Sequence, residues 1–185
     1  MHLENLNLVQ FKNYEELKID FSEAINCFVG ENGSGKTNLL DAIYYLSFAK
    51  SAFNPVDLQI IRHDQDYFSV IGSFKKTERE KVRCSLVKGE KKKIFHGKNQ
   101  LEKASDHVGS YPVVLIAPND TDLILEGSET RRKYFDSLIA QFDKDYLQVG
   151  FNGPFQVDEN NDAISVYDAF LGAPRTYGVT LRMRY

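Results

Sequence analysis

The 185-residue chain has little cysteine and no long apolar run, and each shortage argues against a class of protein. Its two cysteines, Cys27 and Cys84, stand far apart in apolar or alternating runs, where free buried cysteine is common. This favours a reducing, cytoplasmic setting over a disulfide framework. The longest mostly apolar stretch, 39–49, contains Asp41 and is too short to cross a bilayer. The first residues lack the basic and apolar regions of a signal peptide.

An excess of positive charge is also missing. The 23 Lys and Arg and 26 Asp and Glu residues give a net charge of −3, so the chain as a whole is not a polycation that binds nucleic acid. Hydrophobic residues make up 42% and charged residues 26%, which is ordinary for a globular protein. The length allows one domain, or one domain plus a fragment of another.

Hydrophobic patterning predicts several strands. Alternation of apolar and polar residues predicts strands within 3–21 and antiparallel strands over 67–98, with a hairpin turn at 88–91. Two short apolar runs, 25–29 and 112–118, predict fully buried strands.

Two segments have helical spacing. One follows residue 37, with apolar residues at 39, 43 and 46, and ends before Asn54-Pro55. The other begins near Ser128, which we expect at the N-cap, with an apolar face that includes residues 134–142. The elements together predict an α/β fold, in which a mixed sheet carries a loop–helix unit and an antiparallel β subdomain is attached.

A complete phosphate-loop motif, G-x-x-x-x-G-K-[ST], lies between the first predicted buried strand and the first helix. Its glycines allow the backbone N–H groups to converge on phosphate oxygens, and the helix directs its positive end at the same anion. The lysine would reach the β- and γ-phosphates and the threonine hydroxyl would ligate Mg²⁺. An incidental glycine-rich turn is the weaker alternative. The predicted ATP-binding residues are Gly30, Glu31, Asn32, Gly33, Ser34, Gly35, Lys36 and Thr37, with Thr37 as the metal ligand.

The loop, extended through Asn38, follows an opening that carries Phe11-Lys12-Asn13-Tyr14. This combination resembles the head domains of SMC-like, ABC-type DNA-repair ATPases, and most closely the RecF family. The resemblance covers residues 1–148 and adds Asn38 and Lys12 to the expected nucleotide site, since a basic residue lies near nucleotide in similar heads. A surface lysine at the end of a strand is the alternative for Lys12.

A second stretch supports the same family. Pro118-Asn119, an apolar pair at 123–124, Gly127 and Arg131-Arg132-Lys133-Tyr134-Phe135-Asp136 resemble a RecF signature. Asn119, Glu126 and Ser128 depart from it. The arginines would lie at a domain interface or near nucleotide, or else on a solvated helix face with an Arg132–Asp136 pair.

The resemblance implies an ATP- and DNA-binding protein that acts with other recombination mediators at gapped DNA in replication, repair and the SOS response. Its heads would pair around ATP and Mg²⁺, with no membrane partner for residues 1–148. Hydrolysis in this class also needs an apolar strand ending in Asp-Glu (Walker B) and a Ser-x-Gly-Gln type signature. Neither is found in the sequence. We therefore expect ATP binding rather than turnover and assign no catalytic residue.

Positive charge concentrates between residues 75 and 103, where eleven Lys and Arg stand against four acids. Such a segment on an acidic body could contact a DNA backbone, or could be lysine-rich edge strands that resist aggregation. The candidate DNA-binding residues are Lys75, Lys76, Arg79, Arg83, Lys91, Lys92 and Lys93.

The composition changes at Gln148/Val149. Residues 149–185 contain no lysine, and 177–185 alternate strictly up to the terminal Tyr185. This ending resembles the last strand of a TonB-dependent outer-membrane receptor. We expect a chimera, in which a truncated RecF-like head (1–148) joins an unrelated tail (149–185). The alternative is a genuine final strand of the head's sheet.

Two other functions remain open. An unrelated phosphate-loop enzyme, such as a small kinase or GTPase, would share the loop, but no Asn-Lys-x-Asp guanine-reading motif is found. A membrane-barrel fragment would account for the tail alone.

Overall fold

The computed structural model describes residues 1–117, 128–143, 155–157 and 163–165. The chain divides into two compact units, Met1–Leu115 and Ile116–Tyr185. Each unit is described by itself.

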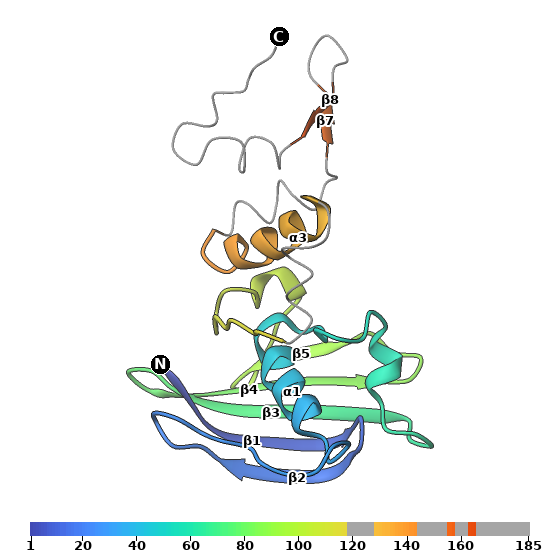
Figure 1. The fold of residues 1–185 in the computed structure, drawn as a ribbon, viewed down its shortest axis with the longest axis vertical. Helices are drawn as coiled ribbons and strands as arrows, with labels where there is room; N and C mark the ends of the chain where they lie inside the picture. The colour runs from blue at the N-terminus through green and yellow to red at the C-terminus, as the bar shows by residue number, and fades with distance from the viewer. Residues whose placement is uncertain (118–127, 144–154, 158–162, 166–185) are drawn as a thin grey trace. The chain divides into compact units, whose positions relative to one another are not determined.

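The first unit is built on one antiparallel sheet of six strands, in the order β2-β1-β3-β4-β5-β6 (Figure 1). Adjacent strands in the order are antiparallel throughout. Short turns join β1 to β2, β3 to β4, β4 to β5 and β5 to β6, so each of these pairs is formed by strands that are consecutive in the sequence. The strands are β1 His2–Phe11, β2 Tyr14–Asp20, β3 Tyr67–Lys75, β4 Arg79–Val87, β5 Lys93–His96 and β6 Asn99–Gln100.

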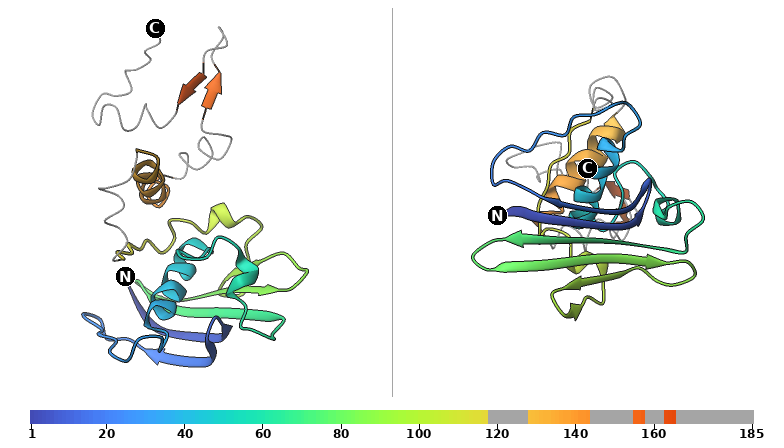
Figure 2. Two further views of the ribbon diagram at one scale, coloured as in Figure 1. Left: turned by 45° about the vertical axis from the view of Figure 1, so that its right-hand side comes forward. Right: turned by 90° about the horizontal axis from the view of Figure 1, so that it is seen from below.

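Helix α1, Lys36–Phe48, covers one face of this sheet (Figure 2). Its buried side includes Leu39, Ala42, Tyr45 and Leu46, which pack in one core with apolar residues of β1, β3 and β4. Gly72 on β3 allows the close approach, because a Cβ at that position would collide with the Leu46 side chain. Two 3-10 turns, η1 Asp57–Ile60 and η2 Ala104–Asp106, complete the regular elements of this unit.

The predicted strands within 3–21 and 67–98 are confirmed, as is the hairpin turn at 88–91, which lies between β4 and β5. They form one continuous sheet, whereas the sequence suggested that the second group stood apart.

The two predicted buried strands are wrong. Residues 25–29 and the described residues 112–117 have no strand structure, and Ile25, Val29, Val114 and Ile116 are 83%, 95%, 61% and 78% exposed. An apolar run becomes a buried strand only when other strands pair with its edges and other elements cover its faces. Among the described residues no strand pairs with either run. For the same reason Cys27 is exposed, although its surroundings predicted a buried thiol.

The second unit contains α3, Ser128–Ile139, and a short antiparallel pair, β7 Phe155–Val157 with β8 Ala163–Ser165. The predicted helix is confirmed, but Ser128 is its first residue rather than its N-cap. Residues 118–127, which hold the start of the RecF-like signature, and the alternating segment 177–185 lie outside the described residues.

Candidate nucleotide-binding site

The loop between residues 30 and 35 has the backbone geometry that its glycines predict. Gly33 and Gly35 adopt φ angles of 84° and 101°, a region that other residues rarely enter. Gly35 is the N-cap of α1, and the first helical hydrogen bond runs from Leu39 N–H to the Gly35 carbonyl at 3.0 Å. The first N–H groups of a helix lack helical acceptors and attract anions. The N-terminus of α1 therefore presents N–H donors next to the loop.

Lys36 turns back over this loop. Its ammonium donates to the carbonyl oxygens of Gly30 and Glu31, at 2.7 and 2.6 Å, and lies 3.5 Å from the Ser34 hydroxyl. These contacts hold the positive charge of Lys36 against the loop. Thr37 follows in the first turn of α1 and is exposed.

The β1–β2 turn lies against the helix end of the loop. The Tyr14 hydroxyl donates to the Gly35 carbonyl at 3.1 Å, and the Asn38 side-chain amide donates to Asn13 Oδ1 at 2.7 Å. Burial raises the pKa of Tyr14, which keeps its hydroxyl protonated as the donor. The motif Phe11-Lys12-Asn13-Tyr14, which carried the family resemblance, is therefore in direct contact with the phosphate loop.

Lys12 makes a buried ion pair with Asp41 of α1, at 2.6 Å between Nζ and Oδ2. The Lys12 side chain is 10% exposed and Asp41 is completely buried, which excludes the alternative of a surface lysine. Asp41 also accepts hydrogen bonds from the Ser51 hydroxyl at 2.6 Å and the Ala52 N–H at 2.7 Å. The carboxylate therefore ties the β1–β2 turn and the segment after α1 to the helix that follows the loop.

Sequence reasoning did not find Asp41 or Asn13 as site residues. A signal for Asp41 existed, because it is the one acid inside the apolar stretch 39–49. A charged residue at such a position is seldom buried without a partner.

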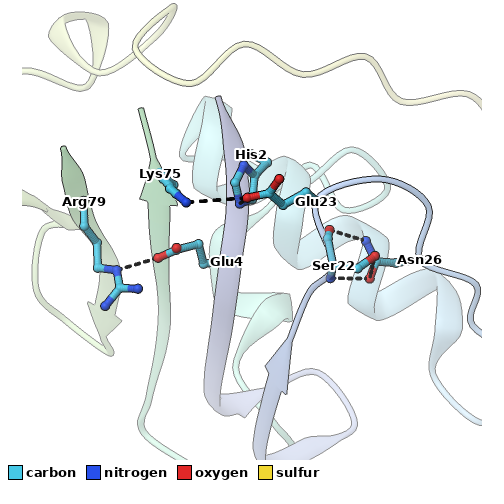
Figure 3. A network of polar contacts seen from close by, with 7 residues as sticks. All are labelled: His2, Glu4, Ser22, Glu23, Asn26, Lys75 and Arg79. Carbon is cyan, nitrogen blue, oxygen red and sulfur yellow. Dashed lines mark hydrogen bonds and ion pairs between the residues drawn. The ribbon is translucent and has the colours of Figure 1, made fainter. Parts of the chain in front are cut away.

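The predicted DNA-binding residues do not gather in one place. Lys75, the last residue of β3, pairs with Glu23, and Arg79, the first residue of β4, pairs with Glu4 (Figure 3). Lys76 lies at the same end, 3.0 Å from Glu80.

A second group lies toward the other end of β4, where Lys93 pairs with Ser85. Ser85 is six residues from Arg79, a distance of about 20 Å along a strand. Lys91 is exposed there, and Lys93 pairs with Glu90 at 2.6 Å. Lys92 instead bonds Asp57 at 2.7 Å and the Ala49 carbonyl, so it links the β4–β5 turn to the segment after α1. Between the two groups, the Arg83 guanidinium stacks 4.1 Å above the Phe95 ring.

The described residues include no group of three or more His, Cys, Asp or Glu side chains placed to hold a metal ion. None of their helices has the length and apolar character needed to cross a membrane.

Known proteins resemble this chain in sequence, and solved structures resemble it in fold. The DNA replication and repair protein RecF of Flavobacterium johnsoniae is 51% identical over 148 residues, which are 80% of this chain and 41% of that protein. RecF of Cytophaga hutchinsonii is 45% identical over 148 residues, 80% of this chain and 39% of that protein. The chain thus spans about two fifths of the length of these relatives.

Solved structures of RecF and of an SMC ATPase are similar to this chain in fold. The recombination mediator protein RecF with ATPrS, in the RecFOR pathway, matches with a TM-score of 0.77 and 30% identity over 82% of this chain and 42% of that one. An SMC ATPase structure matches in fold alone, with a TM-score of 0.59 and 22% identity over 74% of this chain and 99% of that one. The AAA ATPase domain family matches residues 1–170. With its phosphate loop on an ATPase head fold, the chain belongs to the AAA ATPase domain family.

Proposed function

We propose that this chain is the N-terminal part of a RecF-type protein of DNA replication and repair, and that it binds ATP at residues 30–38. The observation that carries the proposal is the Lys36 ammonium, held by loop carbonyls beside the N-terminus of α1. That arrangement combines a fixed cation with converging N–H donors, which is what a nucleotide phosphate chain requires. RecF relatives and a RecF structure with an ATP analogue support the same function.

Mg²⁺ would be held with the nucleotide. Thr37 is exposed next to Lys36 and would supply its hydroxyl, with phosphate oxygens and water as the other ligands. Bound there, the ion would neutralise phosphate charge. Because a Walker B strand and a signature motif are not found in the sequence, we propose binding with negligible turnover.

Calorimetric titration of the 185-residue chain with Mg·ATP tests the proposal. We expect measurable binding of ATP, weaker binding of GTP, and loss of ATP binding in Lys36→Ala. Lys18→Ala is the matched control, because Lys18 is an exposed lysine of β2 that pairs with Glu16. No heat with soluble, folded protein, or equal affinity for ATP and GTP, would contradict the assignment. If the parent chain hydrolyses ATP steadily and Lys36→Ala abolishes that hydrolysis, the proposal of negligible turnover is contradicted.

DNA is the second proposed ligand. The exposed cations of the β3–β5 region, Lys91 and Arg83 among them, would contact phosphates without reading sequence. By the same resemblance the protein would act in the cytoplasm, pair with a second head around ATP, work with other recombination mediators and take part in the SOS response. Band-shift titrations with gapped and intact duplexes, with and without ATP, test this part.

For residues 149–185 we propose an unrelated tail joined to the head at Gln148–Val149. Long single-molecule sequencing of the locus tests it. A continuous, expressed frame across that junction supports a real fusion, and a break in the frame identifies faulty assembly of the sequence.

A further inference from the structure

Two lysine side chains meet at the end of α1. Lys50, which follows the C-cap of the helix, is exposed, and its ammonium lies 5.5 Å from the centre of the Phe48 ring. The Lys92 ammonium donates to the carbonyl oxygen of Ala49, the residue before Lys50, and bonds Asp57 at 2.7 Å. The β4–β5 connection thus brings a second positive charge to the place where Lys50 lies.

The surroundings of Lys50 disfavour its charged form. In the part of the chain that the structure describes, no Asp or Glu pairs with it. The Asp57 carboxylate is already bonded by Lys92 and by the Tyr45 hydroxyl, the latter at 3.1 Å. Protein packed around the ammonium and the charge of Lys92 both lower the pKa of Lys50. More of this lysine is therefore the neutral amine, which is the nucleophilic form.

The same place attracts anions from solvent. An ammonium carries three protons, and Ala49 and Asp57 accept two of those on Lys92. The Lys92 side chain is 22% exposed, so its third proton is within reach of a small anion. Lys91, the exposed residue beside it, adds positive charge. A reagent with a phosphate group would be drawn here, because a cation both attracts it and donates to its oxygens.

We propose that Lys50 is an acylation site of this chain, with its amine as the nucleophile and a small acyl phosphate as the acyl donor. The amine lone pair forms a bond to the acyl carbon, and the bond from that carbon to the phosphate oxygen breaks. Phosphate leaves with the electron pair, beside the Lys92 ammonium, and the amine proton passes to water. The product is a neutral amide, so a positive charge is lost close to the β4–β5 turn. The inference requires neither a nucleotide in the loop nor bound DNA.

Acetyl phosphate is the probe that tests this site. The folded 185-residue chain is treated with it at pH 7.5, and peptide mass spectrometry measures the acetylation rate of each lysine. Lys98 is the internal reference, because it is exposed and has no ion pair among the described residues. We expect Lys50 to react about fivefold faster or more, since each unit by which a pKa is lowered raises the share of neutral amine about tenfold.

Two variants and a second reagent isolate the role of Lys92. Lys92→Gln removes the neighbouring charge and should bring the rate at Lys50 close to that at Lys98. Lys92→Arg keeps a charge and should preserve most of the preference. The N-hydroxysuccinimide ester of acetic acid has no phosphate and needs no variant, so it serves even if a substitution prevents folding. The preference for Lys50 should be smaller with this ester than with acetyl phosphate.

The outcomes decide each part of the proposal. Equal rates at Lys50 and Lys98 in the parent chain would overturn the acylation site. The same preference with both reagents, or a preference that persists in Lys92→Gln, would overturn the role of Lys92 and the choice of an acyl phosphate. A preference that is larger with acetyl phosphate and falls in Lys92→Gln supports the proposal.

Discussion

At the scale of single residues, the site depends on Gly35 for two separate reasons. Its φ of 101° is strained for any side chain, and a Cβ there would lie 2.5 Å from Asn13 Nδ2 and 2.8 Å from the Tyr14 hydroxyl. The motif glycine is therefore needed for its conformation and for the close packing of the β1–β2 turn.

Gly35→Ala should therefore abolish detectable ATP binding. It should also lower the free energy of unfolding by about 2 kcal/mol or more, because the collision with the turn adds to the strain of the φ angle. Gly89→Ala is the control, since Gly89 has a φ of 81° and open space around its Cβ position. The free energy of unfolding of Gly89→Ala should fall by only about 1 kcal/mol, and this variant should bind ATP normally. Urea unfolding and calorimetry measure both. Equal losses of stability in the two variants would show that the contact with the turn is unimportant.

Lys92 and Lys91 are adjacent residues for which we expect opposite effects. Lys91 is exposed, whereas Lys92 bonds Asp57 and the Ala49 carbonyl. Lys91→Gln should reduce DNA affinity, lower the salt dependence of binding by about one unit of slope and leave stability unchanged.

Lys92→Gln should instead lower the free energy of unfolding by about 1–3 kcal/mol, because it leaves the Asp57 carboxylate without its cation. Fluorescence anisotropy at several salt concentrations and urea unfolding distinguish the two effects. A loss of stability in Lys91→Gln, or none in Lys92→Gln, would contradict the assignment.

At the scale of elements, a pair of histidines joins β5, the segment after η2 and the end of α1. His107 Nε2 lies 2.7 Å from the Leu46 carbonyl, to which it must donate, so its Nδ1 accepts from His96 Nε2 at 2.9 Å. His107 is fully buried, and burial lowers its pKa to about 4. A second proton on this ring would remove the acceptor for His96.

Stability should therefore fall in mild acid. The unfolded chain takes up a proton on this histidine near pH 6.5 and the folded chain does not until about pH 4, so stability is lost as the pH falls through this interval. Over the whole interval the free energy of unfolding should fall by an amount on the order of 3 kcal/mol. Glu80, which accepts from Tyr111 and pairs with Lys76, has a lowered pKa and adds to the loss at the acid end.

Urea midpoints between pH 4.5 and 7.5 measure this dependence. His107→Gln should be less stable than the parent at pH 7 and should show a shallower fall in acid. His63→Gln, at a highly exposed position, should keep the parent's profile. An unchanged slope in His107→Gln would rule out this residue as the cause.

Packing between elements gives a further prediction. Gly72→Ala should lower the free energy of unfolding by about 1–3 kcal/mol, because the added methyl group meets the Leu46 side chain of α1. Shortening Leu46 to Ala in the same chain should recover part of the loss, so that the two changes are not additive. Strict additivity in thermal unfolding would show that α1 and β3 do not meet there.

At the scale of the whole molecule, the features that are predicted best from the sequence are those determined by residues close together in the chain. The phosphate loop, α1 and the antiparallel strands follow from glycine positions and from periods of two and 3.6 residues, which are local properties. The Lys12–Asp41 pair joins residues far apart in the chain, so the position of Asp41 in an apolar stretch indicates that it needs a partner but does not identify Lys12. The runs 25–29 and 112–117 were misjudged because burial of a strand depends on its neighbours, which an apolar run does not reveal. The sequence shows that positive charge is concentrated at 75–103, but it does not show that the hairpins spread these charges along β4.

The exposure of Cys27 has a practical consequence. Burial raises the pKa of Cys84 to about 12 and shields it, whereas Cys27 is open to solvent three positions before Gly30. A maleimide dye should therefore label the native molecule at a single thiol, and that dye would sit close enough to the loop for its emission to change as a ligand is added. The unaltered protein thus carries its own attachment point for an optical titration.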